Sequence, residues 1–330
     1  MKSAPIIFIH YGPARYLSTV FRAARQSSPD RDIHFLGDKT NCPFVPKDIH
    51  FHLFEEFLRG SLLRDFRKVF VPIAGRAHHF HKTRGVETWL RFVFERWFFI
   101  REFLEANGIE SFWIFDSDTL IAGNLSLREK QFVGLDATEQ CLGRCLNGWV
   151  SSRTIVDSYC EKMIELYKRP DYLNAQRDRL EIHSGLAFNE MDAWQTHRDE
   201  VGLKTMPLGT PRDGEAFDDA LAITDGWQPA STKVRGRIPV KRIARDRRGG
   251  FFAFTEPEGT PVRLVTLNLS WLPDYVYRKL APGCHAGEER PYDSAFCRNV
   301  DFSEPFADRM IRQGKEFIWK FRTSRKTSEK

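Results

Sequence analysis

Motifs that mark several common enzyme classes are absent from this chain of 330 residues. It has no G-x-x-x-x-G-K-S/T loop, no G-x-G-x-x-G after its first predicted strand and no G-x-S-x-G elbow. Their absence disfavours P-loop enzymes, Rossmann dehydrogenases and serine hydrolases. No apolar run approaches the ~18 residues of a membrane span, and we find neither internal repeats nor low-complexity segments. A soluble globular protein is therefore expected.

Cysteine pairs with metal-ligand spacing are also missing. None of the six cysteines belongs to a C-x-x-C pair, and Cys141 and Cys145 lack the second pair that a zinc site requires. The apolar run at residues 5–9 is too short for the core of a signal peptide, and no small-residue cleavage site follows it. We therefore expect free thiols and a cytoplasmic protein.

Charge is present but unevenly spread. The formal net charge is +6, and apolar residues make up 42% of the chain, as in ordinary globular proteins. Residues 233–248 carry eight basic residues against one aspartate, and residues 309–330 carry eight against two glutamates, so the remainder is net negative. An acidic body with two basic patches argues against a nucleic-acid partner.

The first part of the chain alternates between strand and helix patterns. Residues 6–10 form an apolar run that stops at a Tyr-Gly-Pro turn, a helical stripe covers 16–24, and a second strand pattern at 32–36 ends in Gly-Asp. This β-α-β alternation predicts an α/β fold with a mostly parallel sheet flanked by helices.

Two longer helices follow, and the pattern then changes. One apolar stripe predicts a helix over 88–107, and another predicts a helix over 153–167 with Ser151 or Ser152 at its N-cap. After about residue 205 the sequence is rich in Gly, Pro and basic residues. Because no linker is evident, we expect one domain with a loop-rich C-terminal elaboration.

Two carboxylates, Asp116 and Asp118, directly follow the apolar strand pattern at 112–115. A period of two places both side chains on one side of the chain, where they repel each other unless a cation lies between them. Mg²⁺ and Mn²⁺ accept such carboxylates, and ligands of open α/β sheets bind beyond the carboxyl ends of strands. The alternative is a plain Asp-Ser-Asp turn.

This motif, taken with its surroundings, resembles a known group. The opening strand and loop, the strand end Leu36-Gly37-Asp38, the helix segment Glu95-Arg96-Trp97 and the following Asn124-Leu125 are similar to those of bacterial GT-A-fold, DXD-type glycosyltransferases that use nucleotide sugars. The resemblance covers residues 5–125, with weaker traces to 270. It implies one GT-A-like, Rossmann-like domain with a nucleotide-sugar half (1–125), an acceptor-side half (126–280) and a basic extension (281–330).

The resemblance also implies a metal site. Asp118 would bind Mn²⁺ or Mg²⁺ directly, and Asp116 would contact the ribose or the metal shell. Many relatives supply a third ligand, often a His, from a late strand; here Asn268 stands at that position. An amide oxygen can serve a hard cation, but the replacement departs from the family pattern.

Residues of the donor site follow from the same resemblance. The loop His10-Tyr11-Gly12 would lie near the nucleobase, and Asp38 would lie near the nucleoside. Arg96 would face the phosphates or the sugar of the donor. The alternatives are a hydrogen-bonded histidine at a strand end for His10 and an ion-paired helix residue for Arg96.

Two further carboxylates are candidates for a catalytic base. In an inverting reaction the base must lie within hydrogen-bond reach of the attacking hydroxyl. Asp192 and Glu190 follow a small-residue apolar stretch, and Asp192 is favoured because relatives often carry a Ser-Asp-Met-like segment here. In a retaining reaction both would bind the acceptor instead, and a plain helix surface is the structural alternative.

Weaker signals lie elsewhere. Acidic residues and a tryptophan occur together in two segments, Phe217-Asp218-Asp219-Ala220 and Thr224-Asp225-Gly226-Trp227. Carboxylates beside an aromatic ring suit a sugar-binding site, although turn chemistry explains the Asp225-Gly226 pair equally well. His78, His79 and His81 are interpreted as a surface loop rather than a zinc site, because no Cys or acid lies at ligand spacing.

The sequence thus predicts a metal-dependent glycosyltransferase with a nucleotide-sugar donor and a glycan or lipid-linked acceptor. A sugar-phosphate nucleotidyltransferase is the alternative enzyme, although the loop after the first strand is a poor match to its Gly-rich basic loop. An inert nucleotide-binding module is the alternative from another class. Residues 233–248 could meet an anionic acceptor or the donor phosphates, and the basic, aromatic segment 315–330 could rest on the inner face of a membrane, with a solvated tail as the alternative.

Overall fold

The computed structural model describes residues 3–78, 86–247, 249–284 and 291–312. Its larger sheet has seven strands in the order β3-β2-β1-β4-β7-β6-β8. In chain order these are β1 (Ile6–Ile9), β2 (Ile33–Gly37), β3 (His50–Leu53), β4 (Phe112–Asp116), β6 (Ala137–Gln140), β7 (Cys145–Val150) and β8 (Thr205–Pro207). Strands β1 to β4 are mutually parallel, β7 is antiparallel to both β4 and β6, and β8 is parallel to β6. The large, mostly parallel sheet is therefore present.

A second sheet has the order β13-β10-β11-β12-β5, and β9 also pairs with β12. Its strands are β5 (Thr119–Ile121), β9 (Glu215–Phe217), β10 (Ile243–Asp246), β11 (Phe251–Phe254), β12 (Pro261–Asn268) and β13 (Cys297–Asn299). Because β4 ends at Asp116 and β5 begins at Thr119, the chain passes from one sheet to the other through the Asp-Ser-Asp turn.

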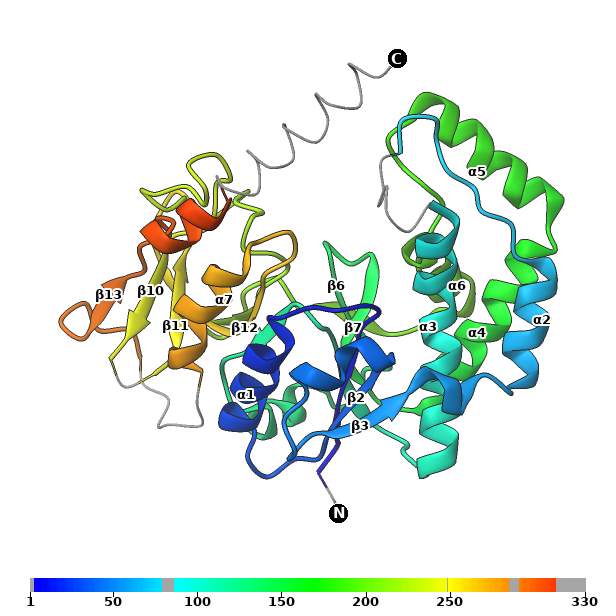
Figure 1. Ribbon diagram of the computed structural model, residues 1–330, viewed down its shortest axis with the longest axis horizontal. Coiled ribbons are helices and arrows are strands. Elements are labelled where there is room, and N and C mark those ends of the chain that lie inside the picture. Colours follow the sequence, from blue (N-terminus) through cyan, green and yellow to red (C-terminus); the bar gives the residue numbers. More distant parts are fainter. Residues whose placement is uncertain (1–2, 79–85, 248, 285–290, 313–330) are drawn as a thin grey trace.

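Seven α-helices flank these sheets in the described residues: α1 (Leu17–Ser27), α2 (Ser61–Val69), α3 (Val86–Asn107), α4 (Arg153–Tyr167), α5 (Pro170–Ile182), α6 (Glu190–Val201) and α7 (Asp274–Leu280). Short 3₁₀ turns are η1 (Lys39–Phe44), η2 (Phe54–Phe57), η3 (Leu125–Leu127), η4 (Glu129–Phe132) and η5 (Ala281–Gly283). Figure 1 shows α2 to α6 gathered on one side of the molecule and the second sheet with α7 on the other. None of the helices in the described part of the chain combines the length and apolar character that crossing a membrane requires.

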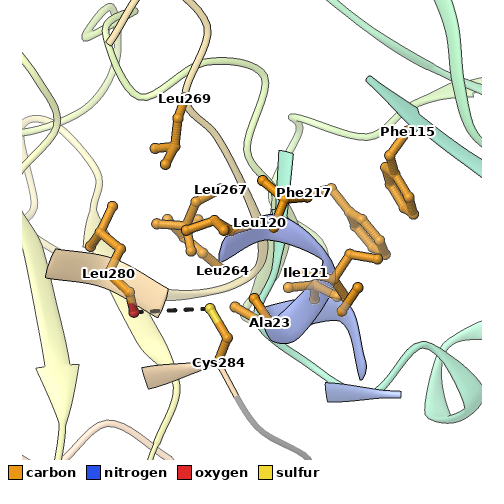
Figure 2. Close-up of a cluster of buried hydrophobic side chains, with 14 of the residues drawn as sticks. Ala23, Phe115, Leu120, Ile121, Phe217, Leu264, Leu267, Leu269, Leu280 and Cys284 are labelled. Atoms are coloured by element: carbon orange, nitrogen blue, oxygen red, sulfur yellow. Dashed lines mark hydrogen bonds between the residues drawn. The ribbon is translucent and has the colours of Figure 1, made fainter. Parts of the chain in front are cut away.

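Alternating side chains of the central strands contribute to two hydrophobic cores. In β1, Ile6 and Phe8 belong to the core shared with α1 and the second sheet, whereas Ile7 and Ile9 belong to the core under α2 to α6. Successive side chains of a strand point to opposite faces, and both faces here are covered, so the strand is apolar throughout. Figure 2 shows part of the first core, to which Ala23 of α1, Leu120 of β5 and Leu267 of β12 all belong.

The predicted elements agree well with the first half of the fold. The helix predicted over 88–107 is α3, which begins at Val86, and the helix predicted over 153–167 is α4 with the same bounds. Ser152 caps α4 by accepting a hydrogen bond from the Thr154 amide at 3.3 Å.

The region after residue 205 differs from the loop-rich expectation. Residues 243–268 contain three strands of the second sheet, of which only the late strand that carries Asn268 was expected. Every residue of β11 is buried, so the alternation that marks a half-exposed strand is missing.

Candidate functional site

The site is built where the parallel strands β1 and β4 end. Ile9 pairs with Asp116 in the register of these strands, so the residue after β1 lies next to the Asp-Ser-Asp turn. His10 follows β1, and its Nδ1 lies 2.8 Å from the Ser117 hydroxyl oxygen. The structure thus joins His10 to the middle of the predicted motif, at the edge of the sheet where ligands bind in α/β folds.

Asp116 lies on the α3 side of the sheet, where Arg96 reaches it. Arg96 donates from Nη1 to Asp116 Oδ1 at 2.8 Å and from Nη2 to Glu190 Oε1 at 3.0 Å. Burial alone would lower the pKa of Arg96, but the charges of Asp116 and Glu190 raise it, so the guanidinium stays charged. Arg96 therefore compensates the negative charge of Asp116. The sequence pattern had assigned this role to a bound cation.

Asp118 faces the second sheet. Its Oδ2 accepts a hydrogen bond from the Ser270 hydroxyl at 2.8 Å, and the same hydroxyl lies 2.7 Å from Asn268 Oδ1. One hydroxyl proton cannot serve both acceptors at once. Asp118 Oδ1 is buried and has no hydrogen-bond partner among the described residues. Because the Ser270 amide also donates to Asn268 Oδ1, at 2.9 Å, Asp118 Oδ1 is the oxygen of this cluster that lacks a donor in the described residues.

A divalent cation fits this cluster. Burial, followed by the charge of Asp116, raises the pKa of Asp118 to about 6, although the Ser270 hydrogen bond and the charge of Arg96 oppose this shift. Carboxylate, amide and hydroxyl oxygens are the ligands that Mg²⁺ and Mn²⁺ prefer, and these ions complete their shell with phosphate oxygens and water. In the described residues no group of three His, Cys, Asp or Glu could hold a metal by itself.

A cavity of about 250 Å³ adjoins the loop after β1. Tyr11, Asp38, Phe54 and Phe92 are among the residues that line it, and the Tyr11 and Phe92 ring centroids are 5.2 Å apart. Asp38 accepts hydrogen bonds from the Gly12 amide and, at 2.7 Å, from the Thr40 amide. Asp38 therefore fixes the loop that presents Tyr11. Phe54 and Phe92 were not among the residues predicted from sequence.

The two candidate bases occupy different environments. Asp192 accepts two hydrogen bonds from Arg179, each at 2.9 Å, and a third from the Asn189 amide at 3.2 Å as part of the α6 capping box. Glu190 uses only Oε1, toward Arg96, and its buried Oε2 has no partner in the described part of the chain. Burial raises the pKa of Glu190 to about 7, although the charge of Arg96 opposes this shift.

Two residues that were not predicted follow Asn268 in the chain, and the first of them contacts Asp118. Ser270 bridges Asp118 and Asn268, and Trp271 follows it with a left-handed φ of +69° and a 76% exposed side chain. A bulky residue in this backbone region is strained, and such strain gathers at functional sites. Both residues lie in the late-strand segment that the sequence singled out for Asn268.

The weaker candidates separate into two groups. Asp219, Asp225 and Trp227 line a cavity of about 670 Å³, whereas Asp218 is buried against Lys241. His78 lies near Trp89, with ring centroids 6.0 Å apart. His79, His81 and the segment 315–330 proposed for membrane contact lie outside the described residues.

Comparisons with known proteins add little to this geometry. No protein-family model matches the chain, and no curated protein matches it. One solved structure to which it is similar is described as "PaToxG Glycosyltransferase", with 8% sequence identity and a TM-score of 0.37 over 60% of this chain and 68% of that one. A likeness this weak assigns no family, so we argue function from the site residues alone.

Proposed function

We propose that this protein is a metal-dependent glycosyltransferase that moves a sugar from a UDP- or GDP-sugar to an acceptor hydroxyl in glycan, glycolipid or polysaccharide synthesis. The proposal rests on the oxygen cluster of Asp118, Asn268 and Ser270, in which Asp118 Oδ1 is buried without a partner in the described residues. Asp118 follows the carboxyl end of the parallel strand β4, the kind of position where nucleotides bind in α/β folds, and Asn268 ends β12 of the second sheet.

The cavity beside the β1 loop supports a nucleoside as part of the ligand. Tyr11, Phe54 and Phe92 offer aromatic faces on which a base can stack. Tyr11 directly follows His10, which is bonded to Ser117 of the motif. A nucleotide whose base occupies the cavity would therefore extend toward Asp118 along the end of the sheet.

Asp118, Asn268 and Ser270 would hold the cation, which supplies charge neutralisation of the departing diphosphate when it is bound. Arg96 stays charged between Asp116 and Glu190 and keeps Asp116 in place. In an inverting reaction Glu190 is the base candidate that the geometry favours, because its Oε2 is uncommitted in the described part of the chain and its pKa is raised to about 7. Such a carboxylate can accept the acceptor proton near neutral pH.

The test is hydrolysis and transfer from a panel of UDP- and GDP-sugars with Mn²⁺ present. We expect turnover that falls about 100-fold in Asp118→Ala, since a charge that stabilises the leaving group is lost. Asp199→Ala, which changes an exposed aspartate of α6, is the matched control and should keep full turnover.

Other outcomes would contradict the proposal in distinct ways. Unchanged turnover in Asp118→Ala would contradict the proposed metal site. Release of pyrophosphate from a nucleoside triphosphate and a sugar phosphate would indicate a nucleotidyltransferase. Thermal-shift experiments that detect neither nucleotide nor Mn²⁺ binding would indicate an inert module with this fold.

A further inference from the structure

A second cavity has a volume of about 670 Å³ and shares no lining residue with the cavity beside the β1 loop. Leu142 of the β6–β7 turn, Pro207, Pro211, Ile223 and Trp227 form its apolar wall. Apolar walls with a few fixed polar groups are typical of pockets for small organic ligands. Nothing in the proposed donor site uses this space.

The polar group fixed in this cavity is Asp219. Its side chain is buried, Oδ2 accepts a hydrogen bond from the Leu142 amide at 3.1 Å, and Oδ1 has no partner among the described residues. Gly209 makes this placement possible, because a Cβ at position 209 would lie 2.6 Å from the Asp219 carboxyl carbon. A buried carboxylate with a spare oxygen is costly unless a ligand donates to it.

The rim of the cavity adds further negative charge. Asp225, Glu256 and Glu258 line it and are exposed. Lys241 is the one cation among the described lining residues; its ammonium is bonded to Asp218 and lies 5.0 Å from the Trp227 ring centroid. Clefts lined by one sign of charge concentrate ligands of the opposite sign.

The cavity is linked to the proposed metal site through Asp218, a neighbour of Asp219. Asp218, next to Asp219 in the chain, accepts a hydrogen bond from the Asn268 amide at 3.1 Å. Asn268 is in turn linked through Ser270 to Asp118. This series of hydrogen bonds connects the lining of the cavity to the proposed metal site.

We propose that this cavity binds the acceptor of the glycosyl transfer and recognises it through a cationic amine, as carried by an amino sugar. The proposal deepens the proposed function and rests on it. The ammonium donates to Asp219 and to the rim carboxylates in charge-assisted hydrogen bonds, and the apolar wall covers the ring of the sugar. Only Lys241 of the basic segment 233–248 lines the cavity. The basic segment therefore does not make this cavity a site for an anionic acceptor.

Saturation-transfer NMR on the full chain tests this, with glucosamine, N-acetylglucosamine and glucuronate as probes. We expect glucosamine to bind most tightly and glucuronate to give no signal. Asp219→Asn should weaken glucosamine binding about tenfold, because a charge-assisted hydrogen bond becomes a neutral one. Asp225→Asn should weaken it in the same direction, and Glu181→Gln, at an exposed site of α5, should leave it unchanged.

Binding of UDP and of GDP with Mn²⁺, measured on the same samples, separates the two proposals. Binding of either nucleotide without glucosamine binding overturns the acceptor proposal and leaves the proposed transferase intact. Glucosamine binding without binding of either nucleotide supports the amine site but contradicts the proposed transferase, and with it the acceptor role. Equal binding of glucosamine and glucuronate, or unchanged binding in both aspartate variants, also overturns it.

Discussion

Arg96 distinguishes the carboxylates at the end of the sheet by the charge partner that each one has. Its guanidinium lies between Asp116 and Glu190, so the two carboxylates share one positive charge that the protein itself supplies. Asp118, two residues from Asp116, faces Ser270 and Asn268 instead, where no basic side chain is bonded to it in the described part of the chain. The two aspartates of one motif are therefore expected to differ in function.

Glu190 and Asp192 are likewise expected to differ. Glu190→Gln should lower transferase turnover strongly with little change in the free energy of unfolding, because Gln keeps the volume and an oxygen toward Arg96 but cannot take a proton. Asp192→Asn should lower the free energy of unfolding by about 2 kcal/mol, since its bonds to Arg179 are charge-assisted. Turnover and urea unfolding of both variants check this; the reverse pattern would identify Asp192 as the base.

His197 should make stability depend on pH. Burial, helped by the charge of Lys162, lowers the pKa of His197 to about 4, whereas an unfolded histidine titrates near 6.5. Because the unfolded chain then binds the proton first, the free energy of unfolding should fall by about 2 kcal/mol as the pH drops from 6.5 to 4.

Urea unfolding of the wild type and His197→Gln across this range measures the effect. The variant should show a flatter pH profile, and His183→Gln, at an exposed position after α5, should keep the wild-type slope. Parallel profiles for all three proteins would show that His197 is not responsible.

At the scale of elements, the N-terminal cap of α6 stabilises the helix and also positions a residue of the site. Asn189 caps this helix by accepting a hydrogen bond from the Met191 amide at 3.0 Å, and Glu190 is the first helical residue. Asn189→Ala should therefore cost about 1 kcal/mol and also lower turnover, because Glu190 loses its fixed position. Ser152→Ala removes the cap of α4 at a similar cost and should leave turnover unchanged. If both variants lose turnover equally, general destabilisation explains the effect.

The elements also show why some parts of the fold could be predicted. Helix α4 has an apolar stripe and a serine cap in its sequence, and β4 is an apolar run that ends at an aspartate, so local patterns reveal both. Ser270 reaches Asp118 across 152 positions of the chain, and the pairing of β12 with β5 creates that contact. No local pattern encodes such a register, which is why the sequence identified Asn268 and Asp118 but not the serine between them.

At the scale of the whole molecule, a buried ion pair lies where the two sheets meet. The side chains of Asp218 and Lys241 are 0% and 3% exposed, and Asp218 also binds the Asn268 amide of β12 and, through its carbonyl, the Gln140 side chain of β6. Lys241→Met leaves a buried carboxylate without its cation, which costs about 3–5 kcal/mol. Asp218→Asn combined with Lys241→Met should recover most of this loss, because no uncompensated charge remains buried. Urea unfolding of both variants tests the pair, and a single variant as stable as the wild type would show that water reaches Asp218 and that the pair does not hold the sheets together.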